Sequence, residues 1–186
     1  VQPDCRSLPD FLKVFDFFMP LLKNPDAIER LALELCADCA RDNVVYFETR
    51  FAPHLVATRS FSPRDAVAAA LRGLEHGNRA AGTDSRLILC CCRHLPHHSL
   101  AVAELAAEFQ DRGVVGIDLA CDERQPAAPH QAAFAQARAH GVHRTVHAGE
   151  AGPPQLIRDA LDLLQAERLG HAVALQHDPE LYQRVQ

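Results

Sequence analysis

Two short segments near the end of the chain contain residues whose types and spacing could support catalysis. In TVHAGE, residues 145–150, His147 ends an apolar run, and Glu150 follows it after a glycine that permits a sharp turn. An imidazole can bind zinc, and a carboxyl group held near that metal can transfer a proton. Standing alone, this pair favours an ordinary His and Glu at a strand-to-helix junction.

A second imidazole strengthens the functional interpretation. His171, in ERLGHA at residues 167–172, follows Glu150 by 21 residues, the length of one loop, helix and strand. In a parallel sheet that spacing places both residues at the same rim, on neighbouring strands. We therefore predict that His147, Glu150 and His171 face one another, since a structural explanation needs all three to be coincidental.

The apolar pattern predicts the elements that position these residues. Helical spacing at i, i+3, i+4 and i+7 alternates with short runs rich in Val, Ile and Leu, which are typical of buried parallel strands. We expect opening helices over residues 8–22 and 25–41, followed by five strands that alternate with helices. The expected strands are VVYFETRFAP, RLILCCCR, VVGIDLA, HRTVHA and RLGHA.

Such alternation predicts an α/β protein with a parallel sheet and helical crossovers. Polar residues collect at the C-terminal ends of the strands, where active sites lie both in TIM barrels and in open α/β sheets. The pattern by itself leaves both architectures open. The chain contains no glycine-rich motif of the kind that binds nucleotide phosphates.

The composition indicates one domain with an ordinary surface. Of the 186 residues, 48% are hydrophobic, and the net charge is −5. Lysine and arginine are dispersed, which argues against nucleic-acid binding, and no apolar run approaches the ~18 residues of a transmembrane helix. Among the seven cysteines, Cys36 and Cys39 form a pair, but no second pair completes a zinc ribbon. Free thiols in a reducing compartment are therefore expected.

The two motifs and their surroundings resemble the adenosine deaminase family, which comprises adenosine and AMP deaminases of the metal-dependent hydrolase superfamily. The segments SLPDFLKVFDFFMP, VVYFETRFAPHL, LILCCCRHLP and VVGIDLACDE match that family in the same order, so the resemblance spans nearly the whole chain. The family fold is an eight-stranded TIM barrel. The resemblance implies a partial TIM (β/α) barrel of about five strands, preceded by an α-helical lid segment. Residues 1–186 would then form one partial domain, truncated at both ends.

The resemblance also implies an activity and roles for the three rim residues. The family hydrolyses adenosine or deoxyadenosine to the inosine form and releases ammonia, using a zinc ion that activates water. By motif match, His147 is a zinc ligand and Glu150 donates a proton to the purine ring. His171 orients and stabilises the attacking hydroxide.

Further residues match the part of the family that contacts the purine nucleoside. Leu8, Phe11, Leu12 and Phe15 match its apolar lid, although a helix face packed on the core explains them equally well. Asp118 matches a position near the site, where it could support a residue that touches the metal or serve as a buried structural carboxylate.

Cys121 stands where the family segment GIDLAGDE has a glycine whose backbone contacts the substrate. The backbone N–H survives this change. The added side chain would crowd the ligand, or strain the chain if the backbone there needs a positive φ.

The family binds zinc through three His and one Asp. Two of the His form a His-x-His motif, and the Asp belongs to an Asp-Asp pair; this chain contains neither. A catalytic zinc site normally has three protein ligands, so we expect residues 1–186 alone to bind zinc weakly or not at all.

Two other functions remain open. One is a non-catalytic relative that docks on a cell-surface peptidase through an outer helix, which corresponds by position to Ser62–Ala81, although Arg64 and the many alanines there argue against it. Another is an aminohydrolase for adenine or a nucleotide, which the apolar lid disfavours because phosphate prefers basic neighbours. Cytidine-type deaminases are excluded because no Pro-Cys-x-x-Cys motif is present. The resemblance implies a cytoplasmic protein and, in some relatives, the cell surface or extracellular space.

Overall fold

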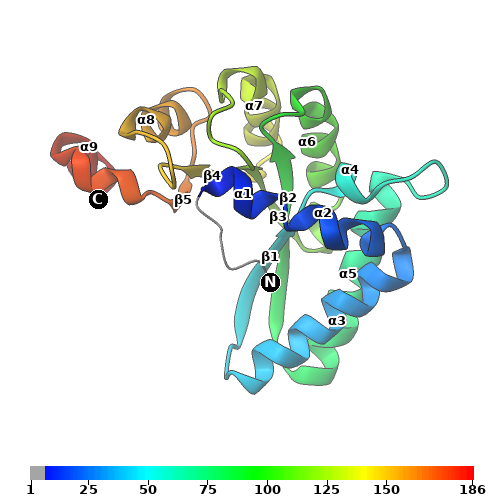
Figure 1. The fold of residues 1–186 in the computed structure, drawn as a ribbon. Coiled ribbons are helices and arrows are strands. Elements are labelled where there is room, and N and C mark those ends of the chain that lie inside the picture. Colours follow the sequence, from blue (N-terminus) through cyan, green and yellow to red (C-terminus); the bar gives the residue numbers. More distant parts are fainter. Residues whose placement is uncertain (1–6) are drawn as a thin grey trace.

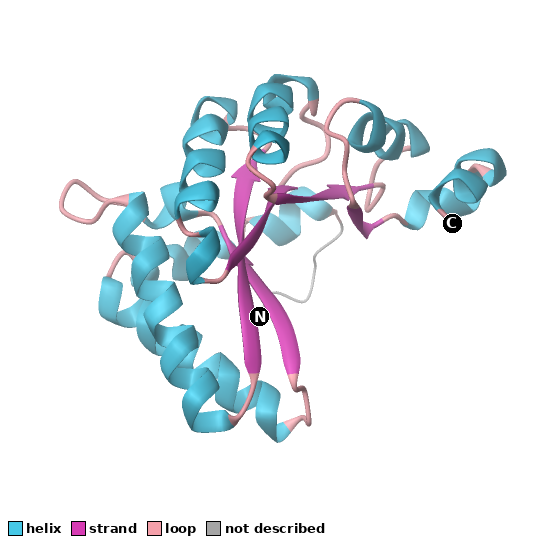
Figure 2. Ribbon diagram, turned by 180° about the vertical axis from the view of Figure 1, so that it is seen from behind, coloured by secondary structure: helices cyan, strands magenta, loops and turns pink. Residues whose placement is uncertain are grey.

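The computed structural model describes residues 7–186, whose strands form one parallel sheet. Each strand pairs in parallel with the next, in the order β1-β2-β3-β4-β5. The strands are β1 (Tyr46–Phe51), β2 (Asp84–Cys92), β3 (Val114–Ala120), β4 (His143–Ala148) and β5 (Arg168–His171). Figures 1 and 2 show this sheet strongly curled, which confirms the expected partial TIM barrel.

The curl brings the two outer strands together. Arg168 of β5 forms an ion pair with Glu48 of β1, although three strands separate them in the sheet. A flat sheet would hold these strands roughly 19 Å apart, at about 4.8 Å per step. Their contact therefore shows that the concave face closes toward a barrel interior.

Helices cover the opposite, convex face of the sheet (Figure 2). Those that follow the opening segment are α3 (Pro25–Arg41), α4 (Pro53–Val56), α5 (Pro63–Ala81), α6 (Ser99–Glu108), α7 (Gln131–Ala139), α8 (Pro154–Asp162) and α9 (Pro179–Val185). Short 3-10 turns lie at 96–98, 110–112, 128–130 and 173–177. The start of α5 illustrates how the sequence sets a boundary: Ser62 and Asp65 form a capping box around Pro63.

Side chains along each strand point alternately to the two faces of the sheet, so the core and the site lie on opposite faces. In β2, Leu87 and Leu89 join the apolar core beneath the helices, whereas Ile88 and Cys90 alternate to the concave face. On β3, Asp118 shares this concave face. Polar groups on it are thus enclosed by neighbouring strands, while the helices stabilise the sheet from behind.

The opening segment differs from the single helix expected over residues 8–22. It comprises α1 (Leu8–Leu12), α2 (Phe15–Phe18) and a 3-10 turn at Met19–Leu22. Bonds of the i→i−3 type replace α-helical ones between the pieces, and Pro20 lacks an N–H to continue the helix. Short helices are stable only when tertiary packing supports them. Within residues 7–186, little packing supports this segment, since 83% of the Phe17 surface is exposed.

Within residues 7–186, every helix is too short or too polar to cross a lipid bilayer.

Candidate active site

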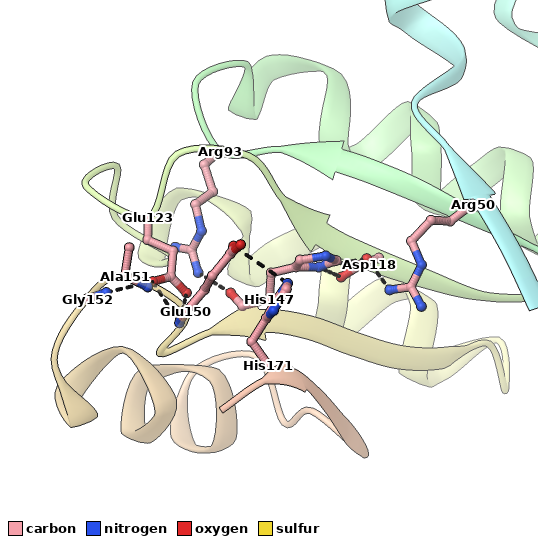
Figure 3. Close-up of polar contacts among 9 residues, drawn as sticks. All are labelled: Arg50, Arg93, Asp118, Glu123, His147, Glu150, Ala151, Gly152 and His171. Atoms are coloured by element: carbon pink, nitrogen blue, oxygen red, sulfur yellow. Dashed lines mark hydrogen bonds and ion pairs between the residues drawn. The ribbon is translucent and has the colours of Figure 1, made fainter. Parts of the chain in front are cut away.

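His147, Glu150 and His171 converge at the C-terminal rim of the sheet (Figure 3). His147 lies in β4, Glu150 follows that strand, and His171 ends β5. The His147 and His171 ring centroids are 5.1 Å apart, and Nε2 of His171 lies 3.5 Å from Oε2 of Glu150. The structure thus brings together the three groups that the sequence placed at one rim.

Unusual backbone conformations at both strand ends make this convergence possible. Gly149 has a φ of 70°, and a Cβ there would lie 2.7 Å from Cδ1 of Ile157. His171 itself has a φ of 65°, and Ala172 follows at 54°. Residues other than glycine seldom adopt this left-handed region, and when they do they cluster at functional sites.

Asp118 fixes the orientation of the His147 ring. Its carboxylate is fully buried and accepts hydrogen bonds from Nδ1 of His147, at 3.0 Å, and from Nη1 of Arg50, at 2.8 Å. A carboxylate only accepts, so Nδ1 carries the proton and Nε2 keeps its lone pair. The hydrogen bond to Asp118 raises the pKa of His147. Of the two explanations left open for Asp118, these contacts favour a group that orients His147.

Two buried charges hold the turn that carries Glu150. Glu123 accepts backbone N–H groups from residues 150–152, and Arg93 donates to the carbonyl oxygen of His147. Neither Glu123 nor Arg93 belongs to the sequence motifs that indicate catalysis. Arg93 binds backbone oxygens. Their position at strand ends is the one sequence feature that could have indicated a role for these residues in the site.

Cys121 adopts a left-handed backbone conformation, which is strained for cysteine but not for the glycine found at this position in the family segment. It follows β3 with a φ of 79°. Its thiol is hydrogen-bonded to that of Cys92, and this contact lowers the pKa of Cys121. The backbone therefore does need a positive φ here, and the cysteine side chain is accommodated beside β2.

The four expected lid residues lie on α1 and α2, outside the buried core. Phe11 and Phe15 are 49% and 44% exposed and meet edge to face, whereas Leu8 and Leu12 are half-buried. The alternative of a helix face packed on the core is therefore wrong for the two phenylalanines. Asp10 of α1 interacts electrostatically with Arg124 of the loop after β3, which places α1 beside the rim (Figure 1).

The described residues supply one part of a zinc site. Nε2 of His147, left free by the Asp118 contact, is a suitable zinc ligand. Across residues 7–186, no three His, Cys, Asp or Glu side chains form a group that could hold a metal ion. The donor set therefore fits one ligand of the family's zinc site, with Glu150 and His171 beside it.

The chain is similar to known proteins over nearly its whole length. The family model described as adenosine deaminase matches residues 1–186. The adenosine deaminase of Gallus gallus is 42% identical over 193 residues, covering 96% of this chain and 54% of that protein.

Solved structures of related enzymes have a similar fold. A zinc-bound amidohydrolase from Burkholderia ambifaria has a TM-score of 0.87 at 30% identity, covering 93% of this chain and 49% of its own. The N6-mAMP deaminase of Arabidopsis has a TM-score of 0.78 at 30% identity, covering 90% and 52%. The chain spans about half the length of the curated relatives it matches. Because the family model matches it from end to end, the chain belongs to the adenosine deaminase family.

Proposed function

We propose that the full-length protein containing this chain hydrolyses adenosine or deoxyadenosine to inosine or deoxyinosine and ammonia, with zinc as cofactor. The observation that carries the proposal is the convergence of Glu150 and His171 beside a histidine whose Nε2 is free. Family membership supports the same activity.

Each rim residue of this chain would have its own role in the reaction. His147 would hold the metal through Nε2, because Asp118 fixes its ring through Nδ1. The chemistry that zinc supplies in such a site is the activation of water as a nucleophile at neutral pH. The Glu150 carboxyl donates a proton to a purine ring nitrogen as water attacks the carbon that bears the amino group. His171, 3.5 Å from Glu150, orients the attacking water. The water would pass one proton by way of His171 to the amino group, which leaves as ammonia, and its second proton would return to Glu150 as the C=O bond forms.

The same rim offers a face for a purine nucleoside. The N–H of Cys121 would contact the purine, while Leu8, Phe11, Leu12 and Phe15 would cover it. The exposure of Phe11 and Phe15 supports a lid, because aromatic side chains left in water are available to pack on a flat base.

A second candidate is deamination of a phosphorylated nucleotide, favoured by the likeness to the Arabidopsis N6-mAMP deaminase. Arg50 and Arg93 are not available for a phosphate, since Asp118 and backbone oxygens engage them. Adenosine is therefore the favoured substrate.

Turnover of adenosine, adenine, AMP and N6-methyl-AMP by the full-length, zinc-loaded protein tests the proposal. We expect adenosine to be the best substrate, and Glu150→Gln or His171→Ala to lower kcat about 10²- to 10⁴-fold. Glu108→Gln, which removes an exposed ion pair with Arg64 on the outer helices, should leave it unchanged. Preference for a nucleotide, or full activity of the Glu150 variant, would overturn the assignment.

We also propose that the protein acts in the cytoplasm. The six cysteines that the structure describes are all free thiols, which is typical of a reducing compartment.

Docking of a cell-surface peptidase on Ser62–Ala81 is a separate proposal. One side of α5 is exposed and carries charged side chains such as Arg72 and Glu75. Retention of such a peptidase by the protein, lost on charge reversal at Arg72, would support it.

A further inference from the structure

We propose that Glu123 is a positioning residue that, together with Arg93, clamps the turn after β4 and so holds the Glu150 carboxyl in its reactive place. The inference deepens the proposed function, on which the role of Glu150 rests. It is drawn from contacts that join three strand ends (Figure 3).

Glu123 occupies a nest of consecutive backbone N–H groups. Its Oε2 accepts from Glu150 at 3.1 Å, from Ala151 at 3.0 Å and from Gly152 at 2.9 Å, and its Oε1 also accepts from Glu150 at 3.2 Å. Successive N–H groups in a turn form an anion-binding concavity. Here the anion is an internal side chain, only 4% exposed, so water cannot easily replace it.

Arg93 holds the other end of the same turn. Its guanidinium, only 2% exposed for the residue, donates through Nη2 to the carbonyl oxygen of His147 at 2.8 Å and through Nη1 to that of Gln125 at 3.0 Å. A negative group thus binds the N–H side of the turn and a positive group the C=O side. Because the two come from the ends of different strands, the turn is tied to the barrel at both ends.

The position of Glu150 depends on this backbone clamp more than on its own side-chain contacts. Among residues 7–186, the ion pair described for its carboxyl is the one with His171, at 3.5 Å, which is long for a hydrogen bond. The Glu150 side chain is also 30% exposed. Its direction must therefore follow from the backbone at residues 150–152, and loss of the Glu123 contacts would let that backbone relax.

A merely structural role for Glu123 makes a different prediction from a positioning role. If it only stabilised the fold, its loss would lower the melting temperature and zinc content, and activity would fall in step. If it positions Glu150, kcat falls while KM and zinc content hold. A misplacement of about 1 Å can cost about 100-fold in rate.

The test uses Glu123→Gln, Glu123→Ala and, as control, Glu108→Gln in the full-length, zinc-loaded protein. We expect Glu123→Ala to lower kcat for adenosine about 10- to 100-fold with KM within about 3-fold. Hydrogen exchange at residues 150–152 should accelerate about 10- to 100-fold relative to β4, and Glu123→Gln should lie between. The control should match the wild type.

Chemical rescue sharpens the result. Acetate matches the methylene carbon and the carboxylate that alanine lacks at position 123, so it should refill the nest in Glu123→Ala. We expect acetate to restore kcat by about 10-fold, whereas acetamide, its neutral counterpart, should not. Equal rescue by acetamide, an unchanged kcat, or a loss of kcat that merely follows zinc content would each overturn the proposal.

Failure of the proposed function would look different. If the wild type deaminates none of the purines offered, the assignment of Glu150 falls. Hydrogen exchange at 150–152 still decides whether Glu123 clamps the turn, because it requires no substrate.

Discussion

The change Asp118→Asn tests how the site holds His147 ready to bind a metal. Asp118 is fully buried and accepts one N–H from His147 and one from Arg50. Asparagine has nearly the same shape but only one accepting group, so it can satisfy one of these donors. If its oxygen keeps Arg50, its amide N–H faces Nδ1 of His147, and the ring must move its proton to Nε2.

The cost can be worked from the lost contact. A hydrogen bond to a charged group contributes about 1.5–3 kcal/mol, and breaking a buried charge pair costs about 3–5 kcal/mol. The Arg50 side chain is 38% exposed and regains hydration, so we take the lower part of the range, about 2–3 kcal/mol. Loss of a group that orients a ligating histidine typically lowers metal affinity about 10- to 100-fold.

Urea unfolding measures the first quantity, and competition with a zinc chelator in the full-length protein measures the second. The matched control is Asp38→Asn, which removes an exposed pair with Arg41 and should cost less than about 0.5 kcal/mol. If Asp118→Asn is as stable as this control and binds zinc as tightly as the wild type, the orienting role is refuted.

Three further changes test other features. Burial lowers the pKa of His54 from 6.5 to about 4, so acid protonates the unfolded chain first and stability falls between these pH values. The free energy of unfolding should fall by about 2 kcal/mol, which is less than the ~3.4 kcal/mol of the full pKa shift because the ring is only partly buried. Urea unfolding at pH 7 and 4.5 measures this loss, and His54→Leu should not show it. Cys121→Gly should raise stability by about 1 kcal/mol in thermal melting, because a φ of 79° strains any other residue; a less stable variant would argue against strain. Gly149→Ala should cost about 2–4 kcal/mol in the same assay, since its Cβ would collide with Ile157; a near-neutral result would show that the turn adapts.

Much of the architecture could be read from local patterns. The five strands and most of the helices lie where the apolar periodicity predicts them, because burial on both faces requires continuous apolar runs. The side chains of Asn24 and Ser62 cap the starts of α3 and α5, and a cap of this kind depends only on residues within one turn. The opening segment was the exception, as its break depends on packing that the local pattern does not report.

The rim residues were predictable for a related reason. In a parallel sheet, the ends of consecutive strands meet at one edge, so the spacing of His147, Glu150 and His171 along the chain was sufficient to bring them together. The sequence by itself therefore determined that the sheet is parallel and which groups lie at its rim, whereas the strand order came from the structure.

Only the tertiary structure decided how those groups are held. The nest around Glu123 joins residues 27 positions apart, and the contact of Asp118 with Arg50 spans 68. Such contacts depend on the curl of the sheet and on backbone angles at single positions, including the positive φ at Cys121 and His171. Periodicity reports which face of an element is buried, but it does not report which distant polar group a side chain will meet there, because that choice is made when the strands curl together.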